Sequence, residues 1–257
     1  MESFVKFDID NKLGLITIDN PEKKNAFTPK MIKEIINFID SIEENAEITC
    51  ILLKSSNDKI FSSGYDISSI KEDYNDNNHP LIQITQRIKE SSKIFIAAIS
   101  GHIFGGALEI AICCDFRFFS KSAIFCIPPA RLGIPYSYSG IKNFINCIGI
   151  SNTRRIFITA DKFDSKDAIN MGIANFLSES KNTINDAIDL CKKISTNAPL
   201  SLKLFKKSIN SFEKSQIQKQ EDFDEIKDLI NKIQNSDDFI EGREAFNQKR
   251  NPNFKGN

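Results

Sequence analysis

The chain of 257 residues has few of the residue types on which several classes of protein depend. It contains no tryptophan and only two histidines, His79 and His102, which leaves too few imidazoles for a typical metal centre. Lysine plus arginine and aspartate plus glutamate both number 34, so no excess charge supports binding to nucleic acid or to an anionic membrane. No apolar run approaches the ~18 residues that span a bilayer. We therefore expect no metal, no nucleic-acid partner and no membrane partner.

The six cysteines form no Cys-x-x-Cys pair, and most of them lie within apolar runs. This placement predicts buried free thiols in a reducing compartment. The first residues enter strand-like sequence without the basic and then apolar pattern of a secretory signal, so we expect a cytoplasmic protein. The cysteines are Cys50, Cys113, Cys114, Cys126, Cys147 and Cys191.

Short apolar runs alternate with amphipathic stretches along the first half of the chain. Apolar and polar side chains alternate over residues 4–18 on both sides of a polar turn, which predicts a hairpin. Thr28 followed by Pro29 predicts a helix N-terminus, because threonine caps helices and proline suits the first helical position. Strands that alternate with helices imply a mostly parallel sheet and an α/β fold. Further strands are expected over residues 48–54, 94–99, 116–119 and 124–127, and a helix over 80–89.

Beyond about residue 138 the pattern is almost wholly helical. Gly172 predicts the end of one helix and Pro199 the start of another, and residues 239–249 are amphipathic. We expect a β/α core over residues 1–195 and a helical C-terminal subdomain over residues 196–257. The polar stretch 71–79 is expected to be a loop. Lys206 and Lys207 lie on a charged helix face, where we expect no specific role.

Two glycine-bearing segments, residues 61–67 and 101–109, each follow an apolar strand-like run. Glycine permits sharp turns and the close approach of a ligand to the backbone. Gly105 and Gly106 precede apolar residues with helical character, so they lie at a helix N-terminus, where unpaired N–H groups favour negative charge. One N–H group from each segment, aimed at the same oxygen atom, would form an oxyanion hole.

These segments, together with the motifs at residues 20–21 and 24–26, resemble the crotonase (enoyl-CoA hydratase/isomerase) superfamily. The resemblance covers the whole chain, as far as residues 245–254. It implies a spiral of ββα turns with a helical C-terminal region, assembled as a homotrimer or homohexamer. It also implies an acyl-coenzyme A substrate, with no cofactor beyond the coenzyme A that the substrate carries. The thioester oxygen would be held by the backbone N–H groups of Tyr65 and Gly106.

The same resemblance implies where coenzyme A lies. It would follow residues 23–26 and 62–64, with its adenine at backbone groups near residues 66 and 67. Lys23 and Lys24 are candidates to neutralise phosphate, and simple solvation is the alternative for both. Lys249 is a candidate to reach the ligand of a neighbouring subunit. The expected substrate-binding residues are Lys23, Lys24, Ala26, Ser63, Gly64, Asp66, Ile67, Gly105 and Pro128.

Hydratases of this family use two glutamates, of which this chain retains one. Glu109 lies three residues after Gly106, where the first is expected, whereas Pro129 occupies the place of the second and is neither acid nor base. Residues 128–136 instead resemble the methylmalonyl-CoA decarboxylase subgroup, which implies a role for Tyr136 and the formation of propionyl-CoA. Decarboxylation needs no base to start it, because the departing carboxylate leaves its electron pair behind. The expected catalytic residues are Tyr65, Gly106, Glu109 and Tyr136.

The residues alone leave several alternatives open. Glu109 would be the sole acid or base, would hydrogen-bond Tyr136, or would only complement the helix N-terminus. The chain also suits a hydratase or isomerase that works with Glu109 alone. A further alternative is a catalytically inactive acyl-CoA-binding or scaffold protein that retains only the oxyanion hole. Two departures from the decarboxylase pattern affect the choice of substrate, since tyrosine replaces histidine at Tyr65 and proline replaces threonine at Pro128.

Overall fold

The computed structural model describes residues 4–66, 69, 79–132, 136–214, 236–248, 250, 253 and 255. The strands in this part of the chain are β1 (Val5–Asp10), β2 (Leu13–Ile18), β3 (Cys50–Ser55), β4 (Ile60–Ser62), β5 (Ile94–Ile99), β6 (His102–Phe104), β7 (Phe116–Ser120), β8 (Ile124–Cys126), β9 (Phe163–Asp164) and β10 (Phe176–Ser178). The helices are η1 (Pro21–Lys23), α1 (Pro29–Glu43), α2 (Pro80–Glu90), α3 (Gly105–Ile112), α4 (Pro129–Leu132), α5 (Tyr138–Thr159), α6 (Ser165–Met171), α7 (Thr183–Ile194), α8 (Pro199–Lys214) and α10 (Asp237–Gln248).

The strands form two sheets. The larger has the order β1-β2-β3-β5-β7-β10, and the smaller has the order β4-β6-β8-β9. The pairs β1–β2 and β8–β9 are antiparallel, and the other described pairs are parallel. The chain alternates between the sheets, because β3, β5 and β7 join the larger one while β4, β6 and β8 join the smaller one. This alternation of two strands and a helix is the expected spiral of ββα turns.

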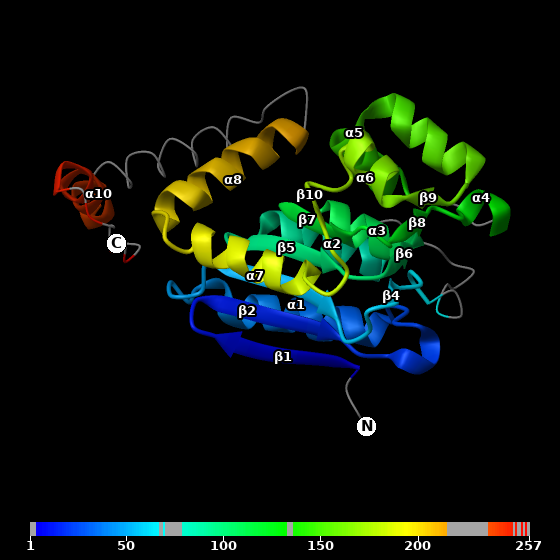
Figure 1. Cartoon of the computed structure of the whole chain (residues 1–257), viewed down its shortest axis with the longest axis horizontal. Coiled ribbons are helices and arrows are strands. Elements are labelled where there is room, and N and C mark those ends of the chain that lie inside the picture. Colours follow the sequence, from blue (N-terminus) through cyan, green and yellow to red (C-terminus); the bar gives the residue numbers. More distant parts are fainter. Residues whose placement is uncertain are drawn as a thin grey trace.

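The larger sheet is covered on both faces. Helix α7 packs on one face, and α1, α2 and α3 lie on the other (Figure 1). Alternate residues of β5 pack against the helices on the two faces of the sheet. Phe95 and Ile99 pack with α1–α3, whereas Ile94 and Ile96 pack with α7. A parallel strand buried on both faces has no solvent side, which explains why residues 94–99 are apolar throughout.

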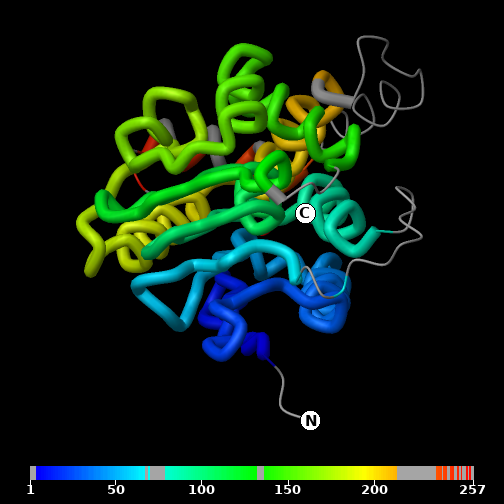
Figure 2. The backbone as a smooth tube through the Cα atoms, turned by 90° about the vertical axis from the view of Figure 1, so that its right-hand side faces the viewer, coloured from blue at the N-terminus to red at the C-terminus, as the bar shows by residue number. Residues whose placement is uncertain are grey.

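Two views at right angles give the same arrangement of the ends of the molecule. The N-terminal strands and α1 lie at one end, and α5 and α6 lie at the opposite end, with the remaining strands between them (Figure 1, Figure 2). The glycine segments that follow β4 and β6 therefore lie within the body of the fold rather than at an extremity.

The local signals in the sequence have the expected structural outcomes. The Thr28 hydroxyl oxygen accepts from the Met31 amide at 3.2 Å, and Pro29 is the first residue of α1. Gly172 ends α6 in the left-handed region with φ +83°. Pro199 begins α8. The predictions of these helix ends are confirmed.

The expectation of an almost wholly helical chain beyond residue 138 is wrong in two places. Strand β9 pairs antiparallel with β8, and β10 extends the larger sheet by pairing with β7. These strands have two and three residues, too short for a period-2 pattern to be recognised. They form because existing sheet edges provide their hydrogen-bond partners.

The expectation that Lys206 has no specific role is also wrong. Its side chain is buried, and Nζ donates to the carbonyl oxygens of Ile88 at 3.1 Å and Lys93 at 2.7 Å. Nζ also forms an ion pair with Asp115 Oδ2 at 2.8 Å. The sequence suggests a charged, exposed helix face at this position. The long apolar stem of lysine nevertheless lets its ammonium group reach polar atoms beneath the helix.

All six cysteines lie in the described residues as free thiols, and five of them are buried. Within the same residues, no helix combines the length and the apolar character that crossing a bilayer would require. The loop expected over residues 71–79 lies outside the described residues, apart from His79, which caps α2 through its Nδ1 atom.

Candidate active site

The two glycine segments meet at the ends of neighbouring strands. Beyond β4 the chain passes through Gly64 with φ +112°, and beyond β6 it enters α3 through Gly105 with φ +51°. A Cβ atom added at Gly64 would lie 3.1 Å from the carbonyl oxygen of Phe104. Both positions thus require glycine for its backbone conformation, and Gly64 also for the close approach of the second segment.

The backbone around Tyr65 sets the direction of its N–H group. Tyr65 forms an isolated parallel bridge with Phe27. In it the Phe27 amide donates to the Gly64 carbonyl at 2.8 Å, and the Asp66 amide donates to the Phe27 carbonyl at 2.9 Å. Consecutive N–H groups of an extended chain point to opposite sides. The Tyr65 N–H group therefore points away from Phe27.

Gly106 lies second in α3, beside Tyr65. A Cβ atom added to it would lie 3.3 Å from the Tyr65 Cβ atom and 2.9 Å from Leu81 Cδ2, so a larger residue would press on both neighbours. The first N–H groups of a helix have no intrahelical partner, and Phe104 at the N-cap offers no side-chain hydrogen bond. The two amides expected to hold an oxyanion thus belong to adjoining segments.

Glu109 lies one turn into α3 and is completely buried. Its Oε2 accepts from the Tyr136 hydroxyl at 2.7 Å, and its Oε1 accepts from Asn143 Nδ2 at 3.2 Å. Desolvation raises the pKa of the carboxyl to about 7, although both hydrogen bonds and the charge of Lys89 act to lower it. A carboxyl with this pKa holds its proton part of the time near neutral pH, as a general acid or base requires.

Aromatic rings and a glycine hold Tyr136 in place. The rings of Phe144 and Phe157 meet it edge-on, with centroids 6.3 Å and 4.9 Å away. A Cβ atom at Gly140 would lie 2.6 Å from Tyr136 Cε1 and 3.0 Å from Glu109 Oε1. Only glycine leaves room at this point of α5 for the pair to hydrogen-bond.

Hydrogen bonds to the backbone join two of the segments expected to bind coenzyme A, residues 23–26 and the segment that holds Ser63. Ser63 donates its amide to the Lys24 carbonyl at 3.0 Å and its hydroxyl to the Lys23 carbonyl at 3.1 Å. The Ala26 amide also donates to the Lys23 carbonyl. Lys23 Nζ forms an ion pair with Asp66 Oδ2 at 2.7 Å, so a phosphate would compete with that carboxylate. Lys24 is exposed and left-handed, with φ +52°.

Pro128 borders the glycine turn at the start of α3, since a Cβ atom at Gly105 would lie 3.9 Å from its Cδ atom. Pro129 then begins α4. The described hydrogen bonds of Glu109 come from a phenol and an amide, and a second carboxylate is not among them. Ile67 and Lys249 lie outside the described residues. The described part of the chain holds no group of three or more potential metal ligands.

Sequence reasoning missed three residues that contact this site: Gly140 and Asn143 of α5, and Lys89 of α2. Lys89 Nζ donates to Asn143 Oδ1 at 2.9 Å. Lys89 and Asn143 also line a cavity of about 590 Å³ that continues toward α7 and α8. Asn143 is one polar residue in a helix without a distinct hydrophobic face, so it carries no signal of its own, and only the docking of α5 on α3 brings it to Glu109.

Comparison with known proteins connects this geometry with one family. The chain matches the family described as enoyl-CoA hydratase/isomerase over residues 8–257. It is 28% identical over 250 residues to methylmalonyl-CoA decarboxylase of Escherichia coli (strain K12), covering 96% of this chain and 95% of that protein. It is 30% identical over 205 residues to short-chain-enoyl-CoA hydratase of Clostridium acetobutylicum, covering 78% of each.

Solved structures give the same result. A methylmalonyl-CoA decarboxylase in complex with 2-nitronate-propionyl-CoA superposes with a TM-score of 0.80 at 27% identity, covering 100% of both chains. Enoyl-CoA hydratase from Bacillus anthracis superposes with a TM-score of 0.88 at 23% identity, covering 99% of this chain and 100% of that one, which shows the shared fold. Because the family match spans nearly the whole sequence, the chain belongs to the enoyl-CoA hydratase/isomerase, or crotonase, family.

Proposed function

We propose that this crotonase-family acyl-CoA enzyme decarboxylates methylmalonyl-CoA to propionyl-CoA. The thioester oxygen is held by the N–H groups of Tyr65 and Gly106. The substrate carboxylate stands out of the thioester plane, and its C–C bond breaks to release carbon dioxide. The bonding electron pair passes into the thioester as an enolate, whose charge collects on the held oxygen. A proton then adds to the α-carbon.

Two backbone donors suit this reaction because they act where charge develops. Loss of one such donor typically costs ~2.7–4 kcal/mol of transition-state stabilisation. The Tyr65 amide is directed by the Phe27 bridge, and the Gly106 amide by the first turn of α3. Both belong to fixed backbone, so they need not reorganise as the enolate forms.

The observation that carries the choice of decarboxylation is the environment of Glu109. Hydratases that resemble this chain use two carboxylates, yet Pro129 stands where the resemblance places the second, and the described partners of Glu109 are a phenol and an amide. A pair of ionised carboxylates would repel the negative charge of the substrate, whereas one carboxyl with a pKa near 7 is partly neutral. Such a group, with Tyr136 beside it, is equipped to deliver a proton to the enolate.

The similarity to methylmalonyl-CoA decarboxylase over nearly the full length of both proteins supports the same substrate class. The similarity to a short-chain-enoyl-CoA hydratase supports a second candidate, a hydratase or isomerase that uses Glu109 alone. A third candidate, a silent acyl-CoA-binding protein, would keep the two amides without turnover.

Methylmalonyl-CoA and crotonyl-CoA offered side by side separate these candidates. We expect methylmalonyl-CoA to lose the mass of carbon dioxide and crotonyl-CoA to stay unchanged in mass spectra. Hydration of crotonyl-CoA alone would favour the second candidate, and tight binding without turnover the third.

Tyr136→Phe tests the role of the phenol. Loss of a hydrogen bond to a charged group costs ~1.5–3 kcal/mol, so we expect decarboxylation to slow about tenfold or more. Tyr138→Phe is the matched control, because Tyr138 is two residues away and 79% exposed. Unchanged kinetics in Tyr136→Phe would remove the proposed role of this residue.

A further inference from the structure

Asn143 stands between a buried carboxyl and a lysine. Its Nδ2 donates to Glu109 Oε1 at 3.2 Å, and its Oδ1 accepts from Lys89 Nζ at 2.9 Å. The ammonium group of lysine donates hydrogen bonds and never accepts them. It therefore fixes which end of the amide faces which neighbour, and the NH₂ end of Asn143 must point to Glu109.

This orientation constrains the proton of Glu109. An NH₂ group facing Oε1 is best accepted by an oxygen that carries no proton, so a proton on the carboxyl is favoured on Oε2. Oε2 is the oxygen that faces the Tyr136 hydroxyl at 2.7 Å. We propose that Lys89 and Asn143 are positioning residues that confine the exchangeable proton of Glu109 to Oε2, on the side of Tyr136.

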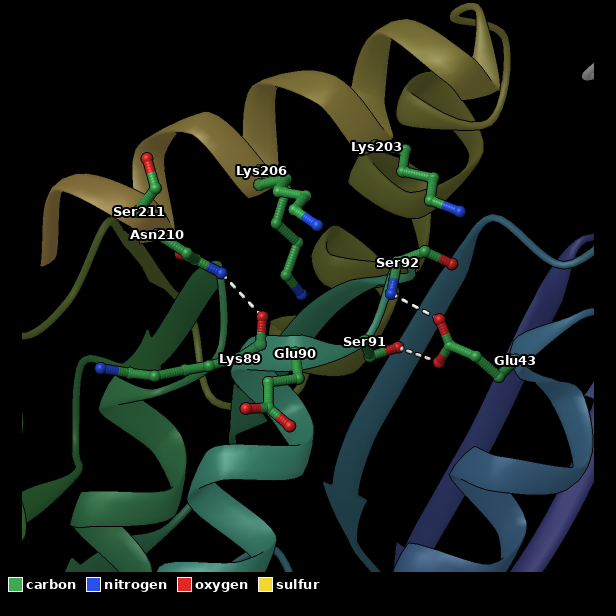
Figure 3. Close-up of a pocket in the computed structure, with 10 residues that line it drawn as sticks. Glu43, Lys89, Glu90, Ser91, Ser92, Lys203, Lys206, Asn210 and Ser211 are labelled. Atoms are coloured by element: carbon green, nitrogen blue, oxygen red, sulfur yellow. Dashed lines mark hydrogen bonds between the residues drawn. The ribbon is translucent and has the colours of Figure 1, made fainter. Parts of the chain in front are cut away.

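Helix α8 contacts the backbone of α2 at Lys89 and the residue before it. Asn210 Nδ2 donates to the Lys89 carbonyl at 2.7 Å, and Lys206 Nζ donates to the Ile88 carbonyl at 3.1 Å. Figure 3 shows Asn210 and Lys206 pointing from α8 to the last turn of α2, while the side chain of Lys89 extends in another direction. Its Nζ atom reaches Asn143 of α5. The backbone of Lys89 is thus held by α8, while its ammonium group donates to Asn143.

Three titratable groups in the described part of the chain interact with Glu109. Lys89 of α2 is the cation that acts on it, Tyr136 precedes α5, and the thiol of Cys113 lies at the end of α3. Burial raises the pKa of the Cys113 thiol well above its usual value, so this group stays neutral across the working range. Lys89 is therefore the group whose removal should change the titration of Glu109.

The inference rests on the proposed role of Glu109, but its test needs no substrate. The ligand-free protein is labelled with ¹³C at glutamate carboxyls, and the resonance of Glu109 is assigned by its loss in Glu109→Gln. Lys89→Met removes an opposite charge at short range, so we expect the apparent pKa of Glu109 to rise by about one unit. Lys89→Arg restores a donor with a positive charge and should restore the wild-type titration.

Lys142→Met is the matched control, because it removes the same charge from the residue next to Asn143, and Lys142 is not among the charges that act on Glu109. In Lys142→Met, Glu109 should titrate with the same pKa as in the wild type. Asn143→Leu, which breaks the link between Lys89 and Glu109, should also raise the pKa, and it provides the test if Lys89→Met does not fold.

The same variants predict a change in activity. In Lys89→Met the profile of kcat/KM against pH should move to higher pH, by the same number of pH units as the rise in the pKa of Glu109 measured by NMR. A Glu109 titration that is unchanged in a folded Lys89→Met or Asn143→Leu variant, or that moves equally in Lys142→Met, overturns the inference. Absence of decarboxylation in the wild type, with the titration shift present, overturns the proposed reaction alone.

Discussion

Burial of Glu109 carries a cost to stability, which its proposed role in proton transfer would explain. Its carboxyl is completely buried, and its ionised form has two hydrogen-bond donors and one nearby cation, yet desolvation outweighs them and raises the pKa to about 7. A group whose folded pKa exceeds its unfolded value favours folding most at low pH. That contribution is fully present below pH 4.5 and is lost as the pH rises to about 7.

Glu109→Gln should therefore stabilise the protein in alkaline solution while impairing catalysis. From the shift of the pKa from 4.5 to about 7, the gain above pH 7 is on the order of 3 kcal/mol in the free energy of unfolding, with little gain near pH 4.5. The substituted amide would still reach both partners, by accepting from Asn143 and donating to the Tyr136 oxygen. Urea unfolding at pH 4.5 and pH 8 measures the difference, and an equal effect at both pH values would contradict this account.

At the residue scale, the sequence offers candidates for the site where they lie close together along the chain. Gly105, Gly106 and Glu109 follow one another in one segment, so their spacing could be compared with a known pattern. Asn143 and Gly140 could not be found in this way. Their importance depends on which face of α5 meets α3, and a helix whose hydrophobic face is indistinct does not reveal it.

At the scale of elements, a buried lysine makes most of the described hydrogen bonds between α8 and the rest of the fold. Exposed apolar side chains of α8, among them Phe205, Ile209 and Phe212, point away from the core. Its polar contacts with α2 and with the residues before β5 and β7 come from Lys206 and Asn210. The stem of Lys206 also places its ammonium group over the ring of Phe95, at 5.1 Å from the centroid.

Lys206→Met should be strongly destabilising. It leaves two buried carbonyl oxygens and the Asp115 carboxylate without the ammonium group, and breaking a buried ion pair in this way costs about 3–5 kcal/mol. We expect the low end, since Asp115 keeps its hydrogen bond from the Phe95 amide. Chemical denaturation measures the change. Lys203→Met, at an exposed position on the same helix, should change stability by less than about 0.5 kcal/mol, and equal effects of the two would contradict the anchoring role.

The elements with strong sequence signals were predicted well, and the short ones were not. α1 has a threonine cap, a proline at its first position and five buried apolar residues at helical spacing. β5 is an unbroken apolar run bounded by polar residues. β9 and β10 have neither, because sheet edges built from distant parts of the chain decide their conformation.

At the scale of the whole molecule, the spiral explains why two half-sites come together. β4 and β6 belong to successive turns and lie side by side in parallel, with Ile60 opposite His102. The carboxyl ends of neighbouring parallel strands share one edge of a sheet, so the loop after β4 meets the loop that opens α3. The pairing of β4 with β6 thereby closes the separation in sequence between Tyr65 and Gly106.

The two glycine segments and their order were enough to predict that these loops lie together, because they resemble those of a family whose fold is known. Elementary patterns alone predicted a parallel α/β sheet but could not assign strands to two different sheets. Strands of three residues, such as β4 and β6, reveal neither their partners nor their sheet.

In the proposed reaction, two backbone amides hold an enolate formed by loss of carbon dioxide. The fate of methylmalonyl-CoA in heavy water, followed by mass spectrometry, tests it most directly. We expect propionyl-CoA carrying one deuterium at the α-carbon, because a proton from the solvent-exchanged site adds to the enolate after carbon dioxide leaves. Methylmalonyl-CoA recovered intact, while crotonyl-CoA gains the mass of water under the same conditions, would contradict it.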